Sequence, residues 1–175
     1  MLQRLWMGAL LGAMVVGLIG GGTVRAQQTT QTVEGVFLYS GGETQRTTLL
    51  DAVRTSTQQV ASAERANVRA QIEEMLRPSP RIVVRRDGTS IVVLGAAGLE
   101  LRSGADYSAT TVAGDWQLRQ RIVSGVLEQR LERAGWVQTQ RYSLSSDRRT
   151  LYIDATLTAP GMTTALSVRL TYTRQ

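Results

Sequence analysis

The large aromatic side chains in the second half of the chain are the residues best suited to contact a ligand. Such rings can line an apolar cavity while their hydroxyl and indole groups supply a few polar contacts, the usual composition of a small-molecule site. The same residues also suit ordinary core packing and cross-strand pairing, so both interpretations stay open. The set comprises Tyr107, Trp116, Trp136, Tyr142, Tyr152 and Tyr172, and the predicted ligand-binding residues are Trp116, Trp136, Tyr107 and Tyr142.

Acidic residues close in sequence are the second group that could do chemistry. Glu128 and Glu132 fall on one face of a predicted strand, and paired carboxylates can serve in glycoside hydrolysis. Arg130 stands between them, which favours a charged outer stripe instead. The adjacent pair 73–74 is interpreted as a helix surface, and Asp147, followed by two arginines, as a solvated turn. No catalytic residue is predicted.

Three residue types are missing from the chain, and their absence excludes several chemistries. The sequence has no cysteine, no histidine and no lysine, so all 20 basic residues are arginine. Ser-His-Asp and Cys-His systems need an imidazole base, and zinc sites draw mainly on Cys and His. No glycine-rich phosphate loop and no EF-hand spacing occurs in the sequence. We therefore expect no cofactor, no metal site and no enzymatic activity.

The first 26 residues have the three parts of a secretory signal peptide. A short segment with Arg4 precedes an apolar run from Leu5 to Ile19, and small residues end the segment at Ala26. We predict cleavage between Ala26 and Gln27. The alternative is an uncleaved membrane anchor, because the apolar run approaches the length of a membrane span. Without cysteine there is no lipid attachment, so the predicted localisation is the periplasm or the exterior, with no stable membrane insertion after cleavage.

The net charge gives little support for a nucleic-acid partner. The formal charge of +6 falls to about +4 without the predicted signal, which contains two arginines and no acidic residue. A basic surface can attract nucleic acid or anionic membranes. Here the arginines are scattered and mostly alternate with acidic residues, and export removes the chain from cellular nucleic acid. No nucleic-acid binding is predicted.

The segment before the sheet predicts a leader, a short strand and one long helix. Residues 27–46 comprise a polar leader and a strand near 33–39, and residues 47–77 form the helix. Its apolar residues recur at helical spacing at Leu49, Val53, Val60, Val68, Ile72, Met75 and Leu76. Such a helix would be about 45 Å long.

After Pro80 the apolar period changes from 3.6 to 2. Asp87-Gly88 between two such runs is a strong hairpin signal. Strand-like runs cover 81–86, 89–94, 99–102, 107–112, 116–123, 126–133, 136–144, 150–158 and 164–173. The predicted fold class is α+β: one long N-terminal helix plus an up-and-down antiparallel β-meander or barrel of about eight to nine strands over 81–175, in a single domain spanning 33–175.

The alternation also predicts which face of the sheet is buried. Leu151, Ile153, Ala155 and Leu157 share one face, and polar residues alternate with them. One apolar and one wet face is typical of a soluble antiparallel sheet, whereas a transmembrane barrel needs an apolar outer band and aromatic girdles.

Residues 81–174 resemble lipocalin-like, calycin-type β-meander domains of exported bacterial proteins of mostly unknown role. The resemblance rests on Gly135-Trp136, the segment 141–147, Leu151-Tyr152-Ile153, Pro160 and the closing segment 169–174. Two departures stand out: Arg148 replaces the usual turn glycine, and the helix precedes the sheet. The lipocalin signature Gly-x-Trp opens the first barrel strand, whereas the same form at 114–116 lies mid-sheet. The resemblance implies a fold, with ligand binding as a family property.

Two functions remain open from the sequence. The leading one is an exported, non-enzymatic envelope protein whose sheet binds a small apolar ligand or lipid. The other is a structural or interaction module, in which the long helix or a sheet edge contacts an envelope protein or a second copy. The deciding question is whether the helix fills the interior of the sheet or leaves a cavity there.

Overall fold

The computed structural model describes residues 32–95 and 99–175, so the predicted signal peptide and its cleavage site lie outside the described residues. Strand β1 (Gly35–Tyr39) comes first, followed by helices α1 (Gly42–Ser56) and α2 (Ser62–Leu76). The remaining strands are β2 (Arg81–Asp87), β3 (Ser90–Leu94), β4 (Glu100–Gly104), β5 (Thr110–Val112), β6 (Trp116–Val123), β7 (Val126–Arg133), β8 (Trp136–Leu144), β9 (Thr150–Thr158) and β10 (Leu166–Arg174). A short 3₁₀ turn, η2 (Ala113–Asp115), precedes β6. Neither α1 nor α2 has the length and apolar character of a membrane-spanning segment.

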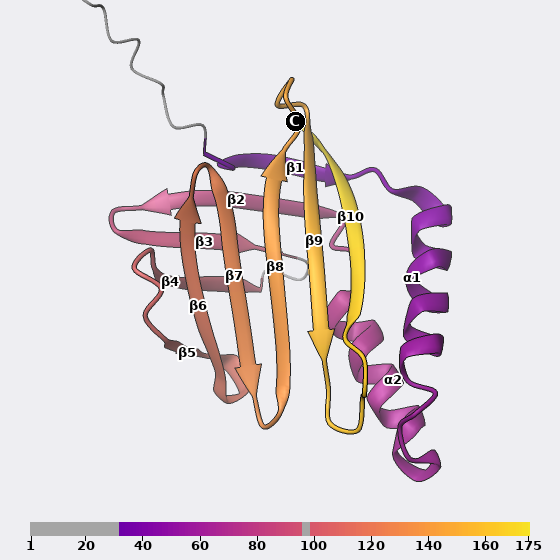
Figure 1. Ribbon diagram of the computed structural model, residues 1–175. Coiled ribbons are helices and arrows are strands. Elements are labelled where there is room, and N and C mark those ends of the chain that lie inside the picture. The colour runs from indigo at the N-terminus through magenta and orange to yellow at the C-terminus, as the bar shows by residue number, and fades with distance from the viewer. Residues whose placement is uncertain (1–31, 96–98) are drawn as a thin grey trace, which may run out of the picture.

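All ten strands belong to one antiparallel sheet with the order β4-β3-β2-β1-β10-β9-β8-β7-β6-β5. The first four strands run crosswise behind β6 to β10, so the sheet curls into a nearly closed barrel (Figure 1). Its two ends approach each other where Asp106 bridges to Arg121 and where the Ser103 hydroxyl lies 3.0 Å from Oε1 of Gln120. The predicted antiparallel meander is confirmed.

Residues 81–175 form nine strands, β2 to β10, in agreement with the expected eight to nine, and the short strand predicted near 33–39 is β1. The total in the sheet is ten because β1 is a full member of it. Phe37 of β1 pairs with Ile82 of β2 on one side and with Arg174 of β10 on the other. Strand β1 therefore joins the two halves of the barrel, a long-range pairing that the local sequence pattern of this short segment does not reveal.

The prediction of one long helix over 47–77 is wrong, because the chain forms two helices and the first already begins at Gly42. Thr57 is fully buried just beyond α1, and its backbone N–H and its hydroxyl both bond to the Val53 carbonyl at 3.2 and 2.8 Å. The Ala61 backbone is extended (φ −49°, ψ 137°), so the helix is interrupted there and α2 begins as a separate helix at Ser62. A straight helix of about 45 Å would run past the sheet. The break lets Val53 and Val68 pack into the same cluster.

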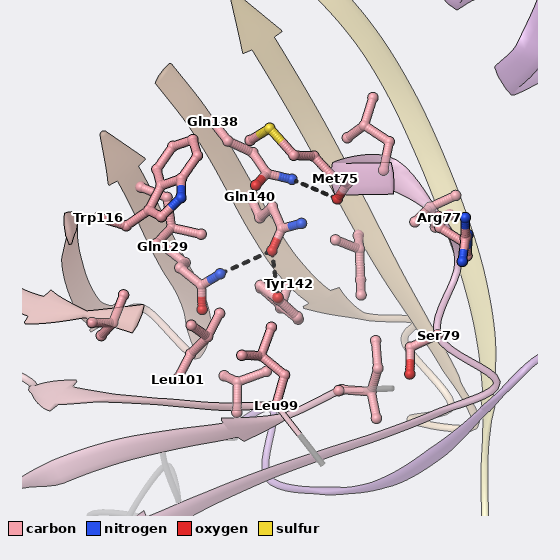
Figure 2. A pocket seen from close by; sticks show the side chains of 18 of the residues that line it. Met75, Arg77, Ser79, Leu99, Leu101, Trp116, Gln129, Gln138, Gln140 and Tyr142 are labelled. Atoms are coloured by element: carbon pink, nitrogen blue, oxygen red, sulfur yellow. Dashed lines mark hydrogen bonds between the residues drawn. The ribbon is translucent and has the colours of Figure 1, made fainter. Parts of the chain in front are cut away.

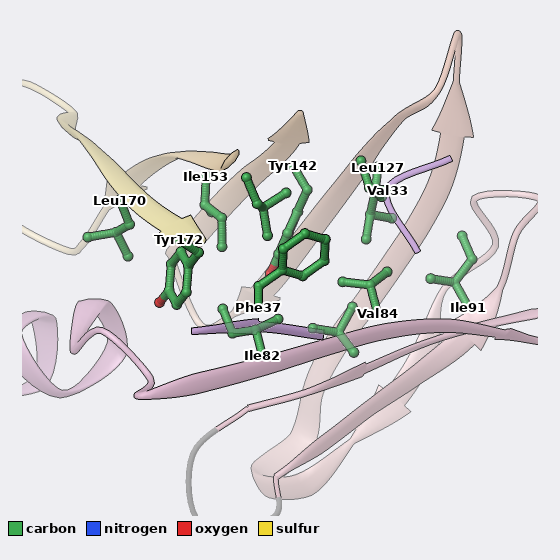
Figure 3. Packing of buried hydrophobic residues seen from close by; sticks show 12 residues of the cluster. Val33, Phe37, Ile82, Val84, Ile91, Leu127, Tyr142, Ile153, Leu170 and Tyr172 are labelled. Atoms are coloured by element: carbon green, nitrogen blue, oxygen red, sulfur yellow. The ribbon is translucent and has the colours of Figure 1, made fainter. Parts of the chain in front are cut away.

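Two hydrophobic clusters fill different parts of the molecule. The first joins side chains of β1 and β2 to side chains of β8 to β10, as Figure 3 shows for Phe37, Ile82, Tyr142 and Tyr172. The second holds the helices against the sheet: Leu49, Val53, Val60, Val68, Ile72 and Leu76 pack with Trp136, Ala155, Leu157, Ala159 and Leu166. The helices thus cover one part of the inner face of the sheet, and strand side chains of the first cluster occupy another part.

The turns follow their sequence signals. Gly88 has a left-handed φ of 60° in the β2–β3 hairpin, as an Asp-Gly turn requires. Arg148, which occupies the position of a usual glycine, adopts the same conformation with a φ of 63°. The Asp147 carboxylate accepts hydrogen bonds from the Ser145 hydroxyl (2.5 Å) and the Arg149 N–H (3.1 Å), which stabilise the turn despite the arginine.

Candidate functional site

A cavity of about 550 Å³ lies inside the barrel, within the range of small-molecule sites. Its wall is mainly apolar, with Met75, Val93, Leu131, Ile153 and Leu170 contributed by α2 and four different strands. The curled sheet supplies most of the wall, and the C-terminal end of α2 and connecting residues such as Ser79 and Leu99 supply the remainder. The cavity therefore depends on the whole fold and on no single loop.

The charged residues of the cavity lie at its solvent side. Glu74 and Arg77, at the end of α2, are exposed and form an ion pair of 2.5 Å. Glu100, the first residue of β4, is also exposed, and the neighbouring Leu99 side chain is 53% exposed. Among the described lining residues Glu74, Arg77 and Glu100 are the only charged groups, so the deeper wall is uncharged.

Three glutamines form a row across the inner face of β6, β7 and β8. Gln120 pairs in register with Gln129, and Gln129 with Gln140, so the three side chains stand directly opposite one another. Nε2 of Gln120 donates to Oε1 of Gln129 at 2.8 Å, and Nε2 of Gln129 donates to Oε1 of Gln140 at 3.0 Å. We call these three residues the glutamine ladder; Figure 2 shows its Gln129–Gln140 step.

Both ends of the glutamine ladder have hydroxyl partners. The Ser103 hydroxyl donates to Oε1 of Gln120 at 3.0 Å, and the Tyr142 hydroxyl donates to Oε1 of Gln140 at 2.6 Å. Burial raises the pKa of Tyr142 above its ordinary value, so the phenol keeps its proton at neutral and mildly alkaline pH and stays a donor. Gln120 is fully buried and Gln129 is 3% exposed, which makes the ladder part of the interior.

A fourth glutamine on β8 also faces the cavity. Nε2 of Gln138 donates to the Met75 carbonyl at the end of α2, at 3.3 Å, and so links the helix to the sheet (Figure 2). Its Oε1 receives no hydrogen bond from any described residue, and Nε2 of Gln140 likewise donates to none. The cavity wall thus presents one free amide acceptor and one free amide donor.

The predicted ligand-binding aromatics separate into two groups. Trp116 and Tyr142 line the cavity, together with Tyr172. Trp136 is 8% exposed and packs in the second hydrophobic cluster, which holds α1 and α2 against the sheet. Tyr107 lies away from the cavity with the Arg121 guanidinium 4.6 Å from its ring centre. The geometry brings only Trp116 and Tyr142 of the four to one site.

The acidic candidates are engaged on the outer surface. Glu128 contacts Arg121 at 2.7 Å and Arg141 at 3.6 Å, and Glu132 pairs with Arg130. Across the described ranges, no group of three or more Asp and Glu side chains is placed to hold a metal ion. These residues form a charged outer stripe, as the position of Arg130 between the two glutamates indicates.

The inward glutamines are the site residues that our sequence analysis missed. A usable signal exists, because Gln120, Gln129, Gln138 and Gln140 each fall in phase with the apolar residues of their strands, as in Leu127-x-Gln129-x-Leu131. An amide at an inward position requires a hydrogen-bonding partner. Several such amides on neighbouring strands indicate a buried polar network.

The comparisons with known proteins find structural likeness only. No family model and no curated protein sequence matches the chain. The crystal structure of an SAHS (abundant heat soluble) protein from Ramazzottius varieornatus matches with a TM-score of 0.50 at 8% identity, over 83% of this chain and 96% of that chain. The fold is a calycin-type β-barrel. This confirms the coarser part of the sequence resemblance.

Two fatty-acid-binding proteins match less well. One, from Echinococcus granulosus, has a TM-score of 0.48 at 10% identity, over 81% of this chain and 96% of that chain. The other, from Schistosoma mansoni in complex with arachidonic acid, has a TM-score of 0.45 at 13% identity, over 82% and 96% of the two chains. At these levels of similarity the two matches do not indicate what this barrel binds, so a function has to be inferred from its own cavity.

We expect Gln129→Leu to lower the free energy of unfolding by about 1–3 kcal/mol. The substitution leaves the buried Nε2 of Gln120 without an acceptor and removes the donor to Gln140, and unpaired buried polar groups cost energies of this size. Urea denaturation measures the effect. Gln117→Leu, on the outer face of β6, is the matched control and should change stability by less than about 0.5 kcal/mol. Equal stability of the two variants would disprove a structural role of the ladder.

Proposed function

We propose that this protein is an exported, non-enzymatic binding protein that holds a small apolar or amphiphilic molecule inside its barrel. The observation that carries the proposal is the cavity of about 550 Å³, walled by apolar side chains and a few inward amides and hydroxyls. A well-formed apolar pocket with a few polar groups is the usual architecture of a ligand site. Export is supported by the predicted signal peptide at residues 1–26.

The alternative of an interaction module loses its main basis. It was based on a long helix or an open sheet edge, and the helical basis is lost because α1 and α2 both pack on the inner face of the sheet near β10 (Figure 1). Binding inside the barrel accounts for a cavity that the helices leave open.

Tryptophan fluorescence tests the proposal, because an indole lies in the cavity wall. We expect titration with dodecanol to produce a saturable change in emission that Trp116→Phe removes and Trp136→Phe keeps, since only Trp116 lines the cavity. A response that persists in Trp116→Phe, or no response to dodecanol, dodecanoate or other long-chain compounds, would contradict the proposal.

A further inference from the structure

The glutamine ladder has a fixed direction, and this direction decides what the cavity offers to a ligand. Each step donates toward β8: Ser103 to Gln120, Gln120 to Gln129, and Gln129 to Gln140. Oε1 of Gln140 also accepts from Tyr142, so both of its lone-pair positions are used. The free group of Gln140 is therefore its Nε2, a neutral donor.

Gln138 complements this donor with an acceptor. It lies two residues before Gln140 on β8 and faces the same side of the strand. Because its Nε2 donates to the Met75 carbonyl, its Oε1 is the atom left free toward the cavity. Neither free amide atom is sealed away from solvent, because the cavity reaches both residues. A head group that both accepts and donates a hydrogen bond can satisfy the two glutamines together.

The charge around this site does not suit an anion. Arg77 is the only arginine among the described lining residues, and its guanidinium is exposed and paired with Glu74. Arg174 lies on β10 in phase with the inward residues, but its guanidinium contacts the Phe37 ring and the Glu34 carbonyl, away from the cavity wall. A carboxylate placed beside Gln140 would lose its hydration without gaining a cationic partner, which is energetically costly. A neutral head group that is hydrogen-bonded there avoids this cost.

We propose that the cavity selects amphiphiles with an uncharged head group that accepts and donates hydrogen bonds, such as primary amides and alcohols, over carboxylates. Nε2 of Gln140 donates to the head-group oxygen, Oε1 of Gln138 accepts its hydrogen, and the chain lies against Ile153 and Leu170. This inference rests on the proposed function, since it assumes that the cavity holds an amphiphile.

A matched ligand series tests the selectivity on the unaltered protein. We expect dodecanamide and dodecanol to bind at least about tenfold more tightly than dodecanoate near neutral pH, measured by calorimetry or by the fluorescence of Trp116. If dodecanoate binds as tightly or more tightly, the head-group inference is overturned and the proposed function stands. If none of the three binds, the proposed function itself fails.

Substitutions then assign the selectivity to the amide. Gln140→Leu should weaken dodecanamide about tenfold and leave dodecanoate nearly unchanged, which reduces the ratio between them. Gln117→Leu, the same change on the outer face, should leave all affinities unaltered. An unchanged ratio in folded Gln140→Leu would overturn the role of Gln140. If that variant does not fold, Gln138→Leu provides the same comparison, because it removes only the free acceptor and one contact to α2.

Discussion

Replacing Leu131 with tryptophan is expected to abolish or strongly weaken ligand binding while the barrel still folds. Leu131 lies on β7, two residues after Gln129, and its side chain lines the cavity together with Gln129 and Trp116. An indole there would occupy space inside the cavity of about 550 Å³ and would exclude a ligand chain. We expect affinity for dodecanol to fall by at least about tenfold, the equivalent of about 1.4 kcal/mol.

The control for this substitution is Gln117→Trp, which adds the same ring to the outer face of β6. We expect it to bind dodecanol with the affinity of the unaltered protein. Circular dichroism and urea denaturation check that both variants are folded, since a misplaced ring can cost about 1–3 kcal/mol. Unchanged affinity in Leu131→Trp would place the ligand elsewhere on the molecule.

The largest effect on stability is expected for Trp136→Ala. The indole is 8% exposed and packs in the cluster that joins α1 and α2 to β9 and β10. Removing it should lower the free energy of unfolding by about 3–5 kcal/mol, as for other large-to-alanine changes in a core. Trp116→Ala is the matched comparison: Trp116 is only partly buried and faces the cavity, so its loss should cost clearly less. Equal losses for the two variants would contradict the different positions assigned to the two tryptophans.

The local sequence pattern predicts the meander well because each strand can be recognised from its own residues. The runs 116–123, 126–133, 136–144 and 150–158 coincide with β6 to β9. Most of their apolar residues fall at every second position, most regularly in 150–158, and the glycine-containing turn Ser124-Gly125 separates β6 from β7. The two-residue apolar period and the turn residues between strands can both be recognised within a short segment of sequence.

The helix break could not be predicted in the same way. Residues 47–76 contain no glycine or proline and have helical apolar spacing throughout, which favours one helix. The chain turns at Thr57 because that side chain is buried and bonds back to Val53, and because both helices must reach the same sheet surface. These are tertiary requirements, which commonly override local helix propensity.

The sequence predicts only some residues of the candidate site, for a related reason. Trp116, Trp136 and Tyr142 share the phase of the inward residues of their strands, and the structure places all three on the inner face of the sheet. The alternation cannot say at which level along the barrel each ring lies, and this level separates a cavity residue from a packed one. The glutamines were overlooked because polar residues are usually assigned to the wet face, although their phase already placed them inside.

The location of a bound ligand tests the central claim most directly. Nuclear Overhauser measurements on methyl-labelled protein saturated with dodecanol should show contacts from the alkyl chain to Ile153 and Leu170, deep in the cavity wall. Contacts confined to exposed methyl groups such as those of Leu38 and Leu50, or saturation without any contact to the interior residues, would contradict binding inside the barrel.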